Sequence, residues 1–253
     1  MSYKRSKYFT TSSKKKIKYL FIKKNSQITV VFFHGFMSDM IGEKPTAIKK
    51  FCENKKLNFL KFEYSGHGKS TGKFIQGNIS KWTNEAKQLI KSKIKKKKNL
   101  IFVGSSMGSW IALNLFSFFK KQIKGFVGIA SAPEFLEKLM WKKFSKKIKK
   151  IIMVKKIYHL DHGGFVYPIT KQLIFEGRKN KVLNNKINLK IPIVLFHGTK
   201  DEVVPLNLSK KILKICKKSK RKLIKIKNGN HSLSRKSDLK KICDELNYML
   251  KNI

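Results

Sequence analysis

Residues 99–116 have the sequence NLIFVGSSMGSWIALNLF, and this stretch indicates the architecture of the chain more clearly than any other. Its first five residues form an apolar run after a run of lysines, which predicts a buried strand. The residues from Ser109 onward have the apolar spacing of a packed helix. Between them, residues 104–108 match the pattern G-x-S-x-G at a strand-to-helix junction, which is typical of a nucleophile elbow. So tight a turn requires glycine two positions before and after the serine, and Ser106 is therefore the predicted nucleophile, at a helix N-terminus whose dipole favours negative charge.

A serine hydroxyl is a poor nucleophile until a base takes its proton and a carboxylate orients that base. In proteins built around this elbow, the order along the chain is nucleophile, acid, histidine. Asp201 follows the apolar run 193–196, where the acid is expected, and His231 follows the run 223–226. His231 is also the only histidine beyond position 197. We therefore predict a catalytic triad of Ser106, His231 and Asp201.

Each of these assignments has an alternative. Asp201 could instead cap the helix expected after Pro205, and two other carboxylates compete with it. Glu202 is its direct neighbour, and Glu134 follows the preceding predicted strand. For the nucleophile, the alternative is a serine that caps the helix, with Ser105 the natural cap.

Two backbone N–H groups are needed to bind the oxyanion that forms during acyl transfer. The first is expected from Met107, the residue after the nucleophile. The second is expected from the loop after the early strand 28–33, where Gly35 lets the backbone turn so that the Phe36 N–H can point at the reacting oxygen. His34 in the same loop is interpreted as structural, because His231 already supplies the base.

Apolar runs that suit strands alternate with amphipathic runs that suit helices, which predicts an α/β fold with a mostly parallel sheet. An antiparallel pair is expected to open the fold at residues 7–24. Further strands are expected at 28–33, 57–64, 99–103, 125–130, 191–196 and 222–226, and helices at 44–54, 78–93, 109–116, 206–218 and 235–251. Residues 131–190 interrupt the alternation and are too long for a plain connection, so we predict a core of residues 1–130 and 191–253 with a small, mostly helical lid between them.

The chain of 253 residues has a formal net charge of +45, from 59 basic and 14 acidic residues. Only four of the basic residues are arginine, which dedicated nucleic-acid surfaces use for bidentate contacts. The lysines are spread over every predicted helix, as the codon bias of an AT-rich genome would produce. We therefore expect no specific nucleic-acid partner, and the alternative is a selected anionic partner. In either case the field should attract anionic substrates, membranes and RNA non-specifically.

Cys52, Cys216 and Cys243 are widely spaced and odd in number, so we interpret them as reduced thiols in core or helix positions. No stretch approaches the roughly 18 apolar residues of a membrane span. The basic N-terminus lacks the apolar region of a secretory signal and loosely resembles an organelle presequence, but a first strand near Tyr8 is the favoured interpretation. The expected location is the cytoplasm, with the mitochondrial matrix as the alternative.

Taken together, the elbow, the predicted triad and the order of the elements resemble the α/β-hydrolase superfamily over nearly the whole chain. Residues 62–70, FEYSGHGKS, are similar to its F-D-x-x-G-x-G-x-S loop, with Glu63 in place of the usual aspartate. Residues 43–48, EKPTAI, and the pair Lys81-Trp82 resemble more closely the mitochondrial acyl-glucuronide esterases and palmitoyl-protein thioesterases and their bacterial relatives. The resemblance implies an eight-strand-type sheet with helices on both faces.

The resemblance further implies a serine hydrolase that cleaves acyl esters or thioesters through an acyl-enzyme, with no metal or organic cofactor. Aromatic residues in the predicted lid favour an acyl group with a large hydrophobic surface. A peptidase or C–C bond hydrolase with the same triad is an alternative enzyme. The alternative from another class is a lysine-rich binder of nucleic acid or membrane surfaces on an inactive hydrolase scaffold.

Overall fold

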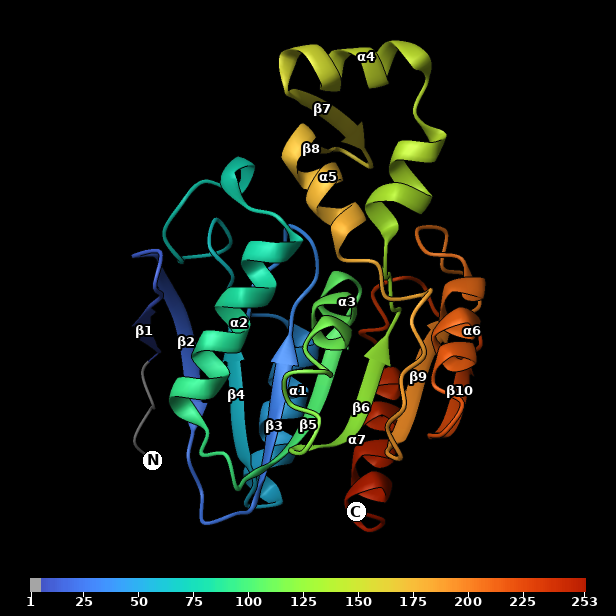
Figure 1. Cartoon of the computed structure of the whole chain (residues 1–253). Coiled ribbons are helices and arrows are strands. Elements are labelled where there is room, and N and C mark those ends of the chain that lie inside the picture. Colours follow the sequence, from blue (N-terminus) through green and yellow to red (C-terminus); the bar gives the residue numbers. More distant parts are fainter. Residues whose placement is uncertain (1–5) are drawn as a thin grey trace.

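An eight-stranded sheet forms the centre of the structure, a computed structural model that describes residues 6–253 (Figure 1). The first five residues, part of the basic N-terminus discussed above, lie outside the described range. The strand order is β1-β2-β4-β3-β5-β6-β9-β10. The strands are β1 (Lys7–Thr10), β2 (Lys16–Ile22), β3 (Ile28–Phe33), β4 (Asn58–Phe62), β5 (Asn99–Ser105), β6 (Ile123–Ile129), β9 (Pro192–Gly198) and β10 (Lys220–Ile226).

The predicted opening antiparallel pair and the mostly parallel sheet are confirmed. β1 and β2 form the opening antiparallel pair, and β2 pairs antiparallel with β4. All other neighbours in this sheet run parallel. The carboxyl ends of the parallel strands therefore meet at one edge of the sheet, where ligand sites of open α/β folds are found.

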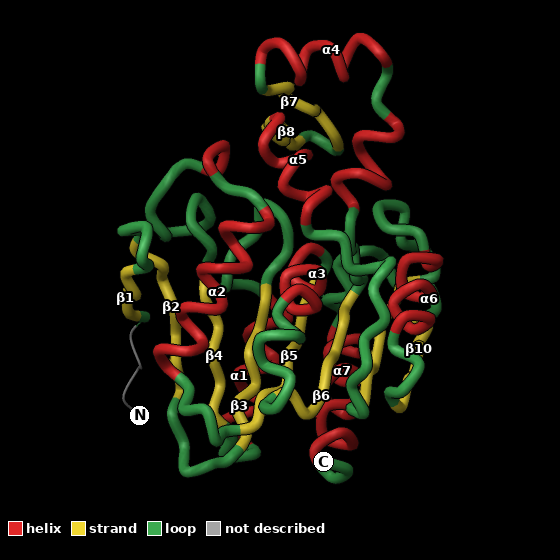
Figure 2. The backbone as a smooth tube through the Cα atoms, in the orientation of Figure 1, coloured by secondary structure: helices red, strands yellow, loops and turns green. Residues whose placement is uncertain are grey.

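Helices cover both faces of the sheet, which explains why the parallel strands are continuous apolar runs rather than alternating ones. In β5, Leu100 and Phe102 face one core cluster, whereas Ile101 and Val103 face the other. The first cluster includes α2 (Ile79–Lys93), α3 (Met107–Asn114) and α6 (Leu206–Ile215), and the second includes α1 (Glu43–Asn54) and α7 (Lys236–Leu250). Figure 2 shows the sheet between these two layers. This is the α/β-hydrolase fold that the sequence predicts.

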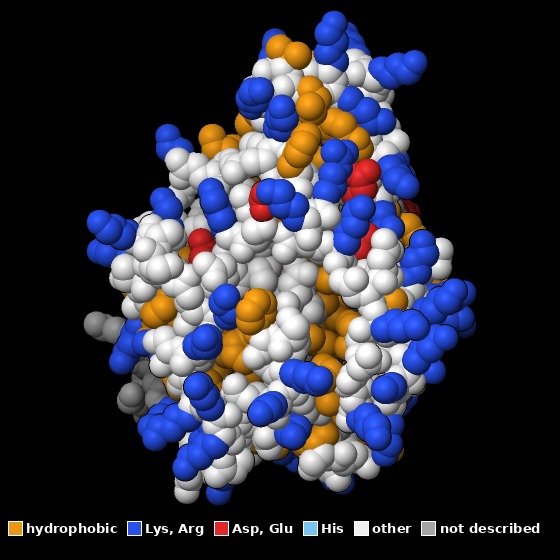
Figure 3. All heavy atoms as spheres, viewed as in Figure 1, with side chains coloured by type: hydrophobic (Ala, Val, Ile, Leu, Met, Phe, Trp, Pro, Cys, Tyr) orange, Lys and Arg blue, Asp and Glu red, His pale blue; other side chains and the backbone are white. Residues whose placement is uncertain are grey.

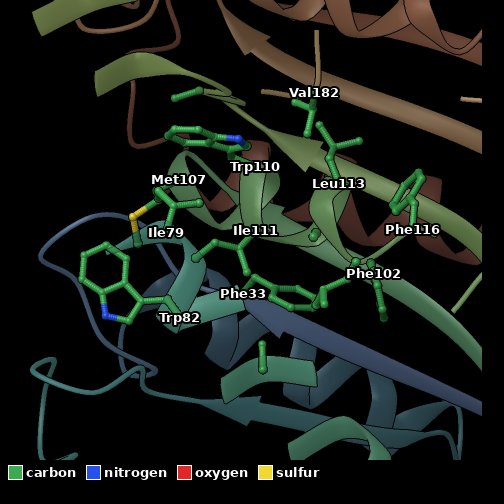
Figure 4. Close-up of a cluster of buried hydrophobic side chains, with 14 of the residues drawn as sticks. Phe33, Ile79, Trp82, Phe102, Met107, Trp110, Ile111, Leu113, Phe116 and Val182 are labelled. Carbon is green, nitrogen blue, oxygen red and sulfur yellow. The ribbon is translucent and has the colours of Figure 1, made fainter. Parts of the chain in front are cut away.

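The elbow helix α3 is buried around most of its circumference, because it lies between the sheet and other helices. Trp110, Ile111 and Ala112 are all 0% exposed. Figure 4 shows these contacts: Ile111 points toward Phe33 and Phe102 of the sheet, whereas Trp110 and Leu113 lie on the side of Val182. A helix held from all sides fixes the position of the turn that precedes it.

Residues 131–190 project from the carboxyl edge of the sheet, between β6 and β9 (Figure 1). They form a π-helical turn (Leu136–Met140), a 3-10 turn (Trp141–Lys143), α4 (Lys146–Lys155), β7 (Ile157–His162), β8 (Phe165–Thr170) and α5 (Lys171–Lys179). The expectation of a mostly helical segment omitted the antiparallel hairpin of β7 and β8. Gly163 and Gly164 both have positive φ angles, of 61° and 76°, as a tight hairpin turn requires.

The three cysteines lie in or beside helices, as expected, and all are free thiols. Burial raises the pKa of Cys216 to about 12 and that of Cys243 to about 11, so neither resembles a reactive thiolate. Among the helices of residues 6–253, none has both the length and the apolar character needed to cross a membrane.

Candidate active site

The predicted site residues meet at the carboxyl edge of the sheet, below residues 131–190 (Figure 1). They come from four loops, which follow β3, β5, β9 and β10. The parallel arrangement brings these loops together although the sequence separates them by up to about two hundred residues.

Ser106 lies at the junction of β5 and α3 with φ 52° and ψ −118°, a conformation that costs a non-glycine residue roughly 1–3 kcal/mol. Its N–H donates a hydrogen bond to the Ile129 carbonyl of β6 at 2.9 Å, which helps to hold the turn. A Cβ atom on Gly104 would lie 2.5 Å from the Cα atom of Ser109. A Cβ atom on Gly108 would lie 2.1 Å from the Phe33 carbonyl oxygen, so backbone blocks both positions.

The structure brings Ser106, His231 and Asp201 into one hydrogen-bonded chain. His231 Nε2 lies 3.1 Å from Ser106 Oγ, and His231 Nδ1 lies 2.9 Å from Asp201 Oδ2. Because the ionised carboxylate can only accept, we assign the proton of a neutral His231 to Nδ1, which leaves Nε2 free to accept from the serine hydroxyl. The His231 side chain is 26% exposed and that of Asp201 only 1%, so the imidazole is accessible from the cleft and the carboxylate is shielded.

Asp201 is held by more groups than His231 alone. Its Oδ1 atom accepts hydrogen bonds from the N–H groups of Val203 at 3.0 Å and Val204 at 2.8 Å. Burial raises the pKa of Asp201, but the hydrogen bond and charge of His231 and the Val204 N–H outweigh it, and the net pKa lies below the ordinary value. His197 donates from Nε2 to the Val204 carbonyl at 2.8 Å, which further fixes this loop.

The competing acids lie elsewhere. Glu134 is buried, and its Oε1 atom accepts from the N–H groups of Val182 and Leu183 at 2.9 and 2.8 Å. Glu202 is exposed at the rim of the cleft. Within residues 6–253, Asp201 is the one carboxylate that makes a hydrogen bond with His231.

The loop after β3 passes beside the serine: a Cβ atom on Gly35 would lie 3.5 Å from Ser106 Cβ. His34 donates from Nδ1 to the Gly35 carbonyl at 2.8 Å, while its Nε2 faces the Tyr64 N–H at 3.4 Å. Burial lowers the pKa of His34, and the nearby His67 lowers it further, so the ring is neutral. The bond to the Gly35 carbonyl fixes the peptide group whose other side carries the Phe36 N–H.

The two predicted oxyanion donors belong to the loop after β3 and to the first turn of α3. Phe36 follows the fixed Gly35 peptide. Met107 is the first residue of α3, and the N–H groups of the first helical turn have no partner within their own helix. The Phe36 side chain lines the cleft, whereas the Met107 side chain is fully buried.

A cleft of about 1030 Å³ opens above Ser106 and His231. Its roof is apolar and comes from the 131–190 segment: Phe135, Leu139, Met140, Phe144, Leu160 and Tyr167. The rest of the lining is polar and carries both signs of charge, with Lys44, Lys143 and Lys200 and also Asp39, Glu43 and Glu202. The cleft therefore offers both apolar and polar surface to a molecule bound above Ser106.

Two residues of the site are not among those predicted from the sequence. Lys44, beside the cleft, donates from Nζ to the Ser232 carbonyl and, at 3.2 Å, to Ser234 Oγ, and so connects α1 to the loop of His231. Burial lowers its pKa. One lysine among so many cannot be singled out by composition. His197 could have been noticed only as a histidine that ends a buried strand, where a structural role is the ordinary interpretation.

Fold and site together define an α/β-hydrolase, and the prediction that the chain is a hydrolytic enzyme is confirmed. More particularly, residues 24–162 match the family described as "Serine aminopeptidase, S33", and the chain belongs to this family. The comparisons agree with the predicted resemblance as well. The bovine (Bos taurus) mitochondrial palmitoyl-protein thioesterase ABHD10 is 28% identical over 215 residues, which cover 83% of this chain and 69% of that protein.

Solved structures give the same result for the fold. A protein of Agrobacterium vitis S4 that is assigned as a hydrolase superposes with a TM-score of 0.91 at 27% identity, over 97% of this chain and 98% of that one. The mouse alpha/beta hydrolase domain-containing protein 10 superposes with a TM-score of 0.89 at 24% identity, over 98% and 99% of the two chains.

Proposed function

We propose that this protein hydrolyses acyl esters or thioesters by nucleophilic catalysis at Ser106. The observation that carries the proposal is the continuous chain from Asp201 Oδ2 to His231 and on to Ser106 Oγ, with spacings of 2.9 and 3.1 Å. These spacings lie within the reach of about 2.6–3.2 Å that proton transfer between such groups requires.

In the proposed reaction, Ser106 Oγ attacks the acyl carbonyl carbon while His231 Nε2 takes the hydroxyl proton. The Asp201 carboxylate stabilises the imidazolium that forms, and the N–H groups of Phe36 and Met107 bind the oxyanion. The intermediate collapses when His231 returns the proton to the departing alcohol or thiol, leaving Ser106 acylated. Water, deprotonated by His231, then attacks the acyl-enzyme. As the second intermediate collapses, His231 returns this proton to Ser106 Oγ, and the products are a carboxylic acid and the free serine.

Residues 131–190 are proposed to act as a lid, separate from a core of residues 1–130 and 191–253. The apolar roof that this segment places over the cleft supports an acyl group with a large hydrophobic surface. The polar part of the lining, which carries charged side chains of both signs, supports a polar leaving group.

The names of the relatives support the thioester side of the proposal and a mitochondrial location, since they are mitochondrial palmitoyl-protein thioesterases. A cytoplasmic location is the other proposal, supported by the composition. The description of the matched family favours a second candidate reaction, release of an N-terminal amino acid from a peptide, which would use the same triad.

The test is a screen of p-nitrophenyl esters and acyl thioesters of increasing chain length, together with aminoacyl p-nitroanilides. Ester or thioester turnover that increases with acyl length is expected. In Ser106→Ala, kcat should fall by at least about 10³-fold, because triad members act as a unit. Ser105→Ala is the matched control and should retain activity.

Faster cleavage of the anilides would replace the esterase proposal by the aminopeptidase. If the protein turns over none of these substrates but binds RNA with an affinity that falls steeply with added salt, it is an inactive scaffold that binds nucleic acid.

A further inference from the structure

The outer side of the 131–190 segment carries lysines beside exposed apolar side chains. Helix α4 forms the outermost part of the molecule there (Figure 1). Its exposed residues follow a helical stripe, beginning with Lys146, Lys147 and Lys150 and ending with Met153 and Val154. The opposite side of α4 packs against β7, and Ile152 on that side is fully buried.

Large apolar side chains are exposed in this region without a partner. Met153 is 37% exposed and Val154 is 66% exposed, at the last turn of α4. Phe165 and Val166 are 68% and 54% exposed, at the turn of the β7–β8 hairpin. We call the α4 residues and Phe165 the apex surface: Lys146, Lys147, Lys150, Met153, Val154 and Phe165. Val166 lies on the other face of β8. Figure 3 shows Lys and Arg side chains around apolar ones at this end of the molecule.

The charge of α4 has one sign, whereas the exposed Asp161 lies opposite Val166 in the β7–β8 hairpin. No acidic residue occurs between Glu137 and Asp161, a stretch that contains all of α4. Among the described residues, Lys146, Lys147 and Lys150 form no ion pair, whereas other lysines, such as Lys138 and Lys179, do. These three charges are therefore available to a partner.

We infer that the apex surface docks on an anionic lipid bilayer. A helix with lysines and apolar side chains on its free face lies in the interface of a membrane, where the apolar groups enter the headgroup region and the ammonium groups meet the lipid phosphates. A nucleic acid fits less well, because the exposed apolar groups are mainly aliphatic rather than stacking aromatic rings. Arg178, the one arginine of the segment, is paired with Glu137.

Docking in this way places the roof of the cleft beside the bilayer. Side chains alternate along a strand, so Phe165 lies on the same face of β8 as Tyr167, which lines the cleft. Leu160 pairs with Tyr167 across the hairpin and lines the cleft as well. An apolar row thus leads from the apex surface to the cleft.

The test is sedimentation of the full chain with vesicles of phosphatidylcholine, with and without phosphatidylserine. Binding is expected only to the anionic vesicles. Each lysine near an anionic membrane strengthens binding by a factor of about five, so the triple variant Lys146→Gln, Lys147→Gln, Lys150→Gln should bind about a hundredfold more weakly. The matched control replaces Lys95, Lys96 and Lys97, exposed at the opposite edge of the sheet, by Gln and should bind within about threefold of the parent.

A second pair of variants tests the apolar contribution. Phe165→Ser should weaken vesicle binding about tenfold, whereas Phe118→Ser, 60% exposed beyond the far end of α3, should not. The inference is overturned if the two triple variants lose vesicle binding equally, or if the two phenylalanine variants do. It is also overturned if the parent binds neutral and anionic vesicles equally. Ser106→Ala should bind vesicles like the parent, which separates this result from the proposed catalytic function.

Discussion

The proposed mechanism depends strongly on Asp201, because its carboxylate fixes the proton of His231 on Nδ1. Asp201→Asn should therefore lower kcat by about 10⁴-fold, because an amide in that place favours the wrong tautomer of the base. Steady-state kinetics on the best ester substrate measure this effect. The matched variants Glu134→Gln and Glu202→Gln should change kcat far less, since neither side chain contacts His231. A loss in Glu134→Gln as large as that in Asp201→Asn would contradict the assignment.

His67 gives a prediction for the pH dependence of stability. Burial lowers its pKa to about 4, and its Nε2 atom has no hydrogen-bond partner among the described residues. The unfolded chain, with a histidine pKa near 6.5, binds more protons than the folded one between pH 6.5 and 4. The free energy of unfolding should therefore fall by about 3 kcal/mol as the pH decreases through this range.

The substitution His67→Phe removes this titration and keeps an aromatic ring among Phe74 and Trp82. Urea unfolding at pH 7 and pH 4 should show a smaller loss of stability in the variant than in the parent. His159→Phe, at an exposed position of β7, is the control and should behave like the parent. A parallel pH dependence of the parent and His67→Phe would contradict this account.

At the scale of elements, the sequence predicts the sheet and its helices because their patterns are local. The run 28–33 coincides with β3, and the helix expected from Asn78 begins there because the Asn78 side chain caps α2. The β7–β8 hairpin was not predicted, although Gly163-Gly164 between two apolar runs is a hairpin signal, because lysine-rich neighbours suggested helices throughout.

The site residues, too, divide into those that the sequence predicts and those that only the structure identifies. The chain order and the elbow predict Ser106, Asp201 and His231, and these side chains lie within hydrogen-bond distance of one another in the structure. Lys44 and His197 could not be found in this way, because they act on loops that only the fold brings close: Lys44 reaches Ser232, and His197 reaches Val204. Contacts of this kind carry no periodic pattern.

Glu134 connects the entry of the 131–190 segment to its exit, through its bonds to the Val182 and Leu183 N–H groups. Glu134→Ala leaves these two donors without a partner, which should lower the free energy of unfolding by about 1–3 kcal/mol for a buried donor. Hydrogen exchange should speed up at residues 182 and 183 and within the segment. Glu134→Gln, which keeps an acceptor oxygen, should lose less. Unchanged exchange in Glu134→Ala would show that the contact does not hold the segment.

At the scale of the whole molecule, the charge of +45 should act on substrates rather than on the chemistry. Exposed charges are screened beyond about 8 Å at physiological ionic strength. For matched neutral and anionic acyl esters, added salt should therefore raise KM selectively for the anionic ester, whereas kcat should change little because the triad acts at short range. If salt changes KM equally for the two esters, the lysines do not contribute to the binding of anionic substrates.

The central claim is that Ser106 becomes covalently modified during turnover. Fluorophosphonates react with serines that an adjacent base activates, so the most direct measurement is peptide mass spectrometry after labelling with such a probe. We predict one adduct, on Ser106, which disappears in Ser106→Ala and is strongly reduced in His231→Gln. An adduct on Ser105 or at any other position, or no adduct on a folded protein that turns over its substrate, would contradict the account.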